Sequence, residues 1–125
     1  MGERALILFA HGARAASWAA PFERLRDLVR AQQPDVDVSL AFLELMSPRL
    51  PERVAELVAG GVSDVTVVPV FLGQGGHVLR DLPVLLDGLR AAHPGLTVRA
   101  VDAVGEDPDV LRAMTEYCVK ALGAA

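Results

Sequence analysis

The strongest constraint on the fold is an alternation of short apolar runs with longer amphipathic segments along the whole chain. The apolar runs cover 5–10, 36–42, 65–72 and 96–100, and each is followed by a segment with apolar residues at helical spacing. Alternating strands and helices predict a parallel sheet whose helical crossovers cover both faces. Because 125 residues is close to the usual size of one domain, we expect 1–125 to form a single domain.

The character of each run predicts its place in the sheet. The runs 5–10 and 65–72 are almost continuously apolar, which is typical of central strands that are buried on both faces. Residues 36–42 and 96–100 alternate in polarity, which is typical of edge strands. The strand order 2-1-3-4 satisfies both patterns. It gives a three-layer, flavodoxin-like α/β fold with a four-stranded parallel sheet, and ligands of such folds bind where the chain reverses its winding, beyond strands one and three.

Composition excludes several classes of protein. The net charge of −4 argues against nucleic acid as a partner, and the apolar runs are far shorter than the roughly 20 residues of a membrane span. The segment 1–4 leads directly into a strand, so we expect no signal peptide and a cytoplasmic protein without a membrane partner.

The last helical segment, which begins at Asp107-Pro108, carries an apolar stripe that we expect to face inward. Cys118 lies on this stripe and is the only cysteine, so no internal disulfide can form. We expect Cys118 to be buried as a small apolar residue. The other members of the stripe are Val110, Leu111, Met114, Tyr117 and Ala121.

Two histidines follow the two central strands. His11 begins the sequence His-Gly-Ala-Arg14, and His77 lies in Gly75-Gly76-His77-Val-Leu-Arg80, so each histidine precedes an arginine by three residues. Both imidazoles should therefore face one cleft at the carboxyl edge of the sheet. Imidazole is the commonest protein ligand for divalent transition metals, and two histidines leave exchangeable positions on the ion. Glu44, at the end of the second strand, is a candidate third ligand or proton acceptor.

Each of these residues also has an ordinary structural interpretation. A histidine beside glycine is often a turn residue, and it is the occurrence of two at the switch point that favours a functional role. The glycines at 73, 75 and 76 serve either backbone geometry or the close approach of a bulky ligand. Arg14 and Arg80 are either surface arginines or partners of ligand carboxylates.

Several blocks of the sequence resemble one family. These are His11-Gly12-x-Arg14, Phe42-Leu43-Glu44, the long segment 68–83 that contains Gly75-Gly76-His77-x-x-Arg80, and Gly105-x-Asp107-Pro108. Together they resemble the short sirohydrochlorin chelatases, the CbiX/SirB-like class II chelatases, over nearly the whole chain. One departure is Ala13, where the family usually has serine.

The resemblance implies an enzyme with a single chelatase-like domain over 1–125. It would insert a divalent metal, Co²⁺ or Fe²⁺, into sirohydrochlorin without ATP or an organic cofactor, in cobalamin or sirohaem biosynthesis. His11 and His77 would bind the metal with Glu44 as a catalytic partner, and Arg14, Gly75, Gly76 and Arg80 would contact the tetrapyrrole. Longer relatives carry two such domains around one cleft, so the resemblance also implies a homodimer.

Two other functions stay open at this point. A non-catalytic carrier of metal or tetrapyrrole would use the same cleft, and Ala13 is the feature that favours it. A phosphoryl-transfer enzyme with His11 as nucleophile is disfavoured because histidine phosphatases carry arginine where this chain has Ala10.

Overall fold

The computed structural model describes residues 4–73 and 75–123, together with their side chains except those of 76–79. Helices and strands alternate along the chain as the sequence predicts. No helix of the described residues is both long enough and apolar enough to cross a membrane. In chain order the elements are β1 (Arg4–Ala10), the 3-10 turn η1 (Ala16–Ala19), α1 (Ala20–Gln32), β2 (Asp37–Phe42), α2 (Leu50–Ala59), β3 (Asp64–Pro69), α3 (Gly76–Ala92), β4 (Thr97–Ala100), the 3-10 turn η2 (Val104–Glu106) and α4 (Pro108–Ala121).

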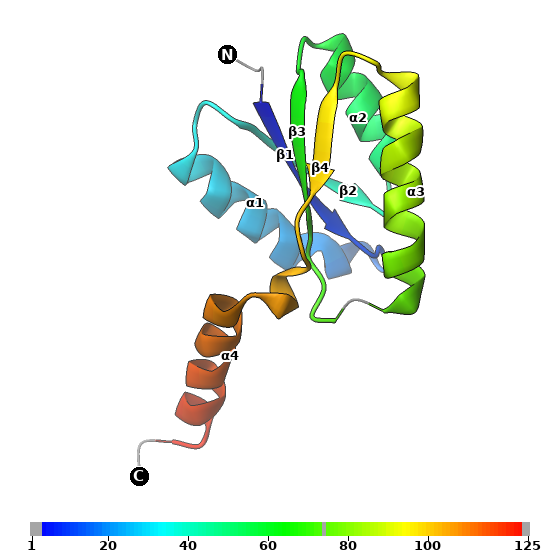
Figure 1. The fold of residues 1–125 in the computed structure, drawn as a ribbon. Coiled ribbons are helices and arrows are strands. Elements are labelled where there is room, and N and C mark those ends of the chain that lie inside the picture. The colour runs from blue at the N-terminus through cyan, green and yellow to red at the C-terminus, as the bar shows by residue number, and fades with distance from the viewer. Residues whose placement is uncertain (1–3, 74, 124–125) are drawn as a thin grey trace.

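The four strands form one parallel sheet in the order β2-β1-β3-β4, which confirms the predicted order. In the register of this sheet, Leu8 of β1 pairs with Leu40 of β2 on one side and with Val68 of β3 on the other. α1 lies on one face of the sheet, and α2 and α3 lie on the other (Figure 1). The fold is therefore the predicted three-layer α/β arrangement, and the carboxyl ends of its strands meet at one edge.

Most of the buried apolar side chains lie between the sheet and the pair α2 and α3. Ile7 and Val67 of the sheet are fully buried there, and Val54 of α2 belongs to the same cluster. Each such side chain contributes roughly 1.5–3 kcal/mol when it is removed from water. A smaller cluster under α1 includes Leu8 and Phe42. These two layers hold β1 and β3 rigidly, and so fix the edge at which both strands end.

The burial of the strands on either side of β1 differs from the prediction, although their order does not. β2, expected to be a half-exposed edge strand, is buried from Val38 onward, because α1 and α2 both pack against it. β3, expected to be buried on both faces, alternates in burial, and its residues Thr66 and Val68 are half-buried. These two side chains face the α1 side of the sheet, where α1 packs mainly on β2 and β1.

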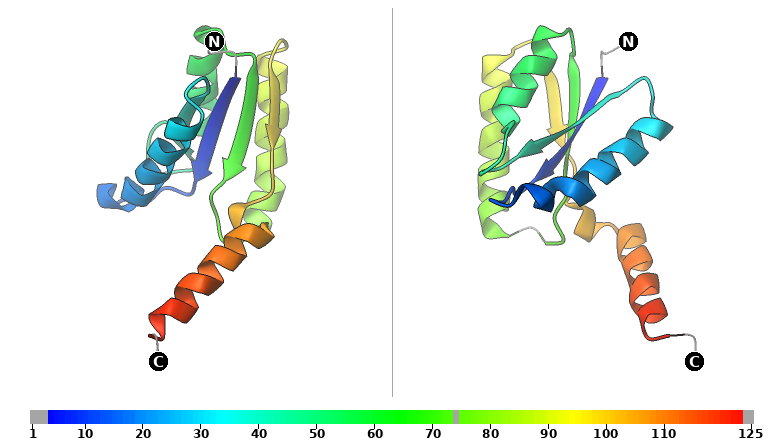
Figure 2. Two further views of the ribbon diagram at one scale, coloured as in Figure 1. Left: turned by 90° about the vertical axis from the view of Figure 1, so that its left-hand side faces the viewer. Right: turned by 180° about the vertical axis from the view of Figure 1, so that it is seen from behind.

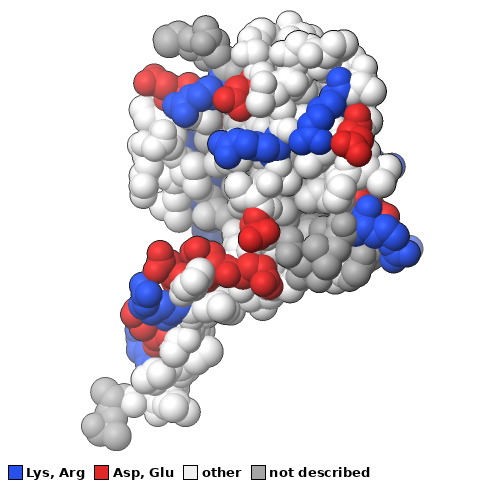
Figure 3. All heavy atoms as spheres, viewed as in Figure 1, with Lys and Arg blue, Asp and Glu red and all other residues white. Residues whose placement is uncertain are grey.

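The prediction that the last helix packs inward is wrong. All of α4 is exposed except Val110, which is half-buried, and Cys118 is an exposed thiol and not a buried one. The helix leaves the rest of the molecule at the carboxyl edge of the sheet in all three ribbon views (Figures 1 and 2). Acidic side chains gather where η2 joins it (Figure 3). The periodicity of α4 correctly indicated a helix with one apolar face, but none of the residues that the structure describes covers that face.

Candidate metal centre

The backbone brings His11 and Glu44 side by side beyond the ends of β1 and β2. The ladder between these strands continues past their last residues: the N–H of Leu43 donates to the carbonyl of Ala10 at 2.9 Å, and the N–H of Glu44 donates to the carbonyl of His11 at 3.0 Å. Both side chains are exposed. The backbones of His11 and Glu44 are therefore adjacent at the carboxyl edge of the sheet, and a joint role of their side chains stays a prediction.

Gly12 fixes this arrangement by allowing a close backbone approach. Its φ is +95°, in the region that favours glycine, and a Cβ at this position would overlap the carbonyl oxygen of Glu44. Only glycine therefore lets the loop after β1 turn directly over the end of β2. A turn at this position was predicted from the sequence. The contact of that turn with the backbone of Glu44 was not.

The imidazole of His11 stacks on the ring of Phe71. The two ring centroids are 4.2 Å apart with planes inclined at 33°, and Phe71 is itself buried against Phe9, whose ring centroid is 5.9 Å away. The stack restricts the imidazole while leaving it exposed for a ligand. No role was predicted for Phe71 from the sequence. The available signal was an aromatic residue just beyond the central strand β3, next to the strand that ends at His11.

His77 is the second residue of α3, so its backbone lies in the first turn of the helix that follows β3. Its side chain lies outside the described residues, and the predicted pairing with His11 stays a prediction. Gly75 is the N-cap of α3, and Gly76 begins the helix. A Cβ at Gly73 or Gly75 would meet nothing within 4 Å, so the space beside these two positions is open.

Among the side chains that the structure describes, no group of three or more His, Cys, Asp or Glu residues could hold a metal ion. Two of the described donors at the carboxyl edge are the imidazole of His11 and the carboxylate of Glu44, whose backbones are hydrogen-bonded to each other. Two exposed donors of this kind leave most positions on an ion exchangeable, unlike the four ligands of a closed structural site. Chemically, the arrangement suits transient binding of a transition metal and transfer of a proton to the carboxylate.

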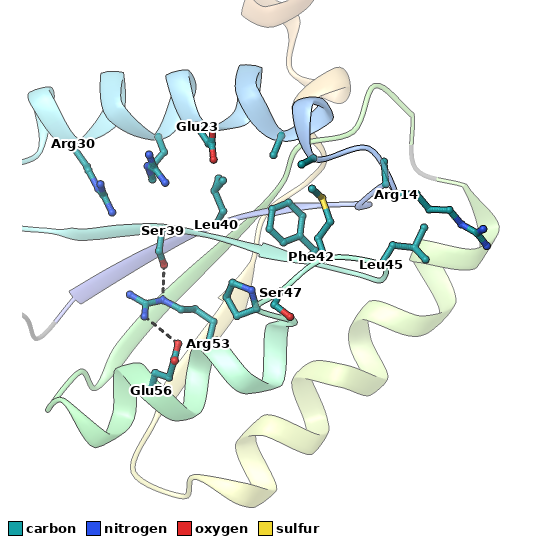
Figure 4. A pocket seen from close by; sticks show the side chains of 16 residues that line it. Arg14, Glu23, Arg30, Ser39, Leu40, Phe42, Leu45, Ser47, Arg53 and Glu56 are labelled. Carbon is teal, nitrogen blue, oxygen red and sulfur yellow. Dashed lines mark hydrogen bonds and ion pairs between the residues drawn. The ribbon is translucent and has the colours of Figure 1, made fainter.

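A groove of 880 Å³ runs along β2 between α1 and α2, and Arg14 and Leu45 line one end of it (Figure 4). The Arg14 side chain extends away from the groove in this view. Arg80 is exposed on α3 and does not line the groove. Both predicted arginines are therefore solvent-exposed, and of the two only Arg14 lines the groove.

Two further arginines of the groove, Arg30 and Arg53, bond to other parts of the fold. Arg53 donates to Ser39 Oγ at 2.8 Å, to Asp37 at 3.2 Å and to Glu56 at 3.2 Å. Arg30 donates from Nε to the carbonyl of Val38 at 2.9 Å. These guanidinium groups already have partners from β2 and α2. We therefore interpret the part of the groove near Arg30 and Arg53 as stabilising the fold, and keep the candidate site at His11 and Glu44.

The four-stranded parallel sheet with helices on both faces defines an α/β protein, a class of fold that binds its ligands at the carboxyl edge of the sheet. More particularly, the chain belongs to the CbiX family, whose model matches residues 5–121. This agrees with the resemblance that the sequence blocks indicate.

The chain is also similar to individual sirohydrochlorin cobaltochelatases. It is 35% identical to that of Methanothermobacter thermautotrophicus over 81 residues, which are 65% of this chain and 56% of that protein. It is 32% identical to that of Methanocaldococcus jannaschii over 89 residues, which are 71% of this chain and 62% of that protein. The chain thus spans little more than half the length of these curated relatives.

Solved structures show the same fold. A CbiX protein of Marinobacter aquaeolei VT8 has a TM-score of 0.84 and 32% identity, and the match covers 95% of this chain and 97% of that one. SirB of Bacillus subtilis subspecies spizizenii, solved in complex with cobalt, has a TM-score of 0.80 and 20% identity, and the match covers 94% of this chain and 50% of that one. This second likeness is one of fold.

Proposed function

We propose that this chain is a sirohydrochlorin chelatase, which inserts Co²⁺, or alternatively Fe²⁺, into sirohydrochlorin in the cytoplasm. The observation that carries the proposal is the hydrogen bond between the backbones of His11 and Glu44 at the carboxyl edge of a CbiX-family chain, where both side chains are exposed. Sirohydrochlorin cobaltochelatases among its relatives support the same reaction. Cobalt leads directly toward cobalamin and iron toward sirohaem.

In this proposal the metal is a substrate that passes through the site. His11 and His77 offer imidazole nitrogens to the incoming ion, which keeps its remaining positions for water and then for the pyrrole nitrogens of sirohydrochlorin. Exposure of His11 lets the ion arrive from solvent. A site with few protein donors also releases the ion readily, because each bond to the protein must break as the macrocycle takes over.

Metal insertion also releases two protons from the pyrrole nitrogens, and the chain needs a group to accept them. Glu44 is suited to this because it lies next to His11, is exposed and has solvent beyond it as the final acceptor. A positioned general base of this kind contributes typically 10²- to 10⁴-fold to a rate. No step of the proposed reaction requires an organic cofactor.

The substrate is a large, flat polycarboxylate. Arg14 and Arg80 are exposed guanidinium groups suited to pairing with its carboxylates. The open space beside Gly75 supports approach of the macrocycle near the start of α3, with Gly76 next to it. We further propose that two copies of the single domain 1–125 form a homodimer, since one copy matches only 48% of a SirB chain of Bacillus subtilis.

Metallation of sirohydrochlorin by the purified chain tests the proposal. With Co²⁺ and then Fe²⁺ as the metal, we expect the absorbance of free sirohydrochlorin to be replaced by that of the metal complex faster than without protein. The rate should saturate with both substrates. A chain that binds cobalt or sirohydrochlorin without accelerating insertion would contradict the enzyme and favour the carrier, to which Ala13 already points.

Gly75→Asp should weaken sirohydrochlorin binding without destabilising the fold. Aspartate is a favourable N-cap and its charge suits the start of α3, so the free energy of unfolding should stay equal or rise by up to about 1 kcal/mol. The new carboxylate would repel those of the substrate, and we expect the KM for sirohydrochlorin to rise about tenfold while the KM for cobalt stays unchanged.

Gly95→Asp is the matched control for this variant. Gly95 is also exposed with open space around its Cβ position, but it precedes β4 and so lies at the opposite edge of the sheet. The Gly95→Asp variant adds the same charge to the chain as Gly75→Asp does. If both variants raise the KM for sirohydrochlorin equally, the effect is one of net charge and the start of α3 does not contact the substrate.

A further inference from the structure

Leu45, the residue after Glu44, has a backbone conformation that leucine rarely adopts. Its φ is +68°, and among the residues that the structure describes it is the one residue other than glycine with a positive φ. In this left-handed region the Cβ of an ordinary residue crowds the following carbonyl oxygen, whereas glycine has no Cβ and asparagine is tolerated. A turn that required only this backbone would therefore favour glycine or asparagine. Leucine at this position indicates that the side chain itself has a use.

The side chain of Leu45 contributes little to the core. It is 56% exposed, and it belongs to neither of the two buried clusters, although its neighbour Met46 packs against the cluster under α1. In Figure 4 it projects from the loop beyond β2, at the end of the groove where Arg14 lies. Burial in the fold therefore does not explain why an apolar side chain is held here against backbone strain.

A second exposed leucine follows the strand on the other side of β1. Leu72 is 63% exposed and is next to the buried Phe71, whose ring stacks on the imidazole of His11. The turn η2 holds this part of the backbone: the N–H of Gly105 donates to the carbonyl of Phe71 at 3.0 Å, and a Cβ on Gly105 would overlap the carbonyl oxygen of Leu72. The Gly105 block of the sequence thus fixes the segment that carries Leu72.

The two leucines follow the two strands that flank the one ending at His11. Leu45 comes after β2 and Leu72 after β3, and both of these strands pair with β1. Neighbouring strands are about 4.8 Å apart, so the ends of β2 and β3 are roughly 10 Å apart, with the end of β1 between them. Sites for large ligands typically combine apolar contacts with a few polar groups. Here an exposed apolar residue follows each strand that neighbours the proposed metal ligand.

We propose that Leu45 and Leu72 bind the flat ring of sirohydrochlorin by apolar contact, one on each side of the imidazole of His11. This rests on the proposed function and names two residues that set its preference for a macrocyclic substrate. Arginines pair with the carboxylates around the ring, but such pairs leave the plane of the ring free to tilt. Two apolar contacts with the imidazole between them fix that plane, and so place the pyrrole nitrogens over the incoming ion.

Leu45→Asn tests the first of these contacts. Because asparagine is tolerated in the left-handed region, the variant should unfold at a urea concentration equal to or higher than that of the unmodified chain. Titration of sirohydrochlorin without metal, followed by absorbance, should give a dissociation constant about tenfold higher, because the ring no longer covers an apolar side chain. The KM for cobalt should stay unchanged. An unchanged dissociation constant for sirohydrochlorin would overturn the proposal.

Two control variants separate apolar contact from other effects at this position. Leu45→Met keeps both an apolar side chain and the backbone strain, so it should bind sirohydrochlorin within about twofold of the unmodified chain. Leu28→Asn is the matched control, because Leu28 of α1 is 65% exposed and does not line the groove. It should leave the dissociation constant unchanged. Weaker binding by either control, equal to that of Leu45→Asn, would overturn the proposal.

Leu72→Asn tests the second contact. Its dissociation constant for sirohydrochlorin should also rise about tenfold, and that of the double variant Leu45→Asn/Leu72→Asn about 100-fold, because the two side chains would contact separate parts of the ring. A rise for only one of the two single variants would overturn the placement of the ring across His11.

These outcomes are separate from those that test the activity. A chain that binds sirohydrochlorin through both leucines but does not accelerate metal insertion would retain this inference and lose the chelatase proposal. A chain that inserts metal with the same KM for sirohydrochlorin in the double variant would retain the chelatase proposal and overturn the inference. A chain that does not bind sirohydrochlorin would overturn both.

Discussion

Replacing both His11 and His77 with alanine is expected to reduce the rate of metal insertion into sirohydrochlorin by about 100-fold or more, close to the protein-free rate. The two imidazoles are the proposed donors that capture the metal, and Glu44 alone offers only a single exposed carboxylate. Because His11 is exposed, its loss removes little buried surface and should leave the fold intact. Initial rates over a range of cobalt concentrations give kcat and KM for the metal.

His93→Ala is the matched control for this double variant. His93 is the C-cap of α3 and lies at the opposite end of that helix from His77, so its imidazole is remote from the carboxyl edge. We expect its rate of metal insertion to equal that of the unmodified chain, and circular dichroism should show folded protein in both variants. A double histidine variant with an unchanged rate would remove His11 and His77 from the mechanism.

The strand order was predicted from the polarity of each run, and the burial of β1 and β4 agrees with a central and an edge strand. The same reasoning failed for the burial of β2 and β3. Ser39 and Ala41 of β2 are buried on the α2 side, where Arg53 of α2 bonds to Ser39, and α1 covers the other face of the strand. Conversely, Thr66 and Val68 of β3 stay half-buried among the described residues, although the sequence of this strand is almost continuously apolar. Sequence pattern indicates that a face is apolar, but not which element covers it.

The candidate site was predictable as far as strand topology determines it. His11 and Glu44 follow adjacent parallel strands, and parallel strands end at the same edge, so their proximity follows from the strand order. The contacts of Gly12 with Glu44 and of Phe71 with His11 join residues that are distant in sequence. They depend on the exact twist and spacing of the strand ends, which periodicity and propensity do not encode.

Gly12→Ala is expected to destabilise the fold more than any other single substitution proposed for this chain. The left-handed backbone at Gly12 costs a non-glycine residue about 1–2 kcal/mol. The added Cβ would also overlap the Glu44 carbonyl oxygen, so the loop or the end of β2 must move. We expect the free energy of unfolding to fall by about 2–4 kcal/mol, which is a large share of the roughly 5–15 kcal/mol of a small domain. Urea denaturation followed by circular dichroism measures this change.

Gly73→Ala separates a requirement for glycine from a general effect of added side chains. Gly73 lies in the loop after β3, without a positive φ and with nothing within 4 Å of its Cβ position, so we expect a change of no more than about 0.5 kcal/mol. Because the strain in Gly12→Ala acts directly on Glu44, metal insertion by the fraction that remains folded should also slow. If Gly12→Ala unfolds at the same urea concentration as Gly73→Ala, the close approach of the Gly12 backbone to Glu44 does not require glycine.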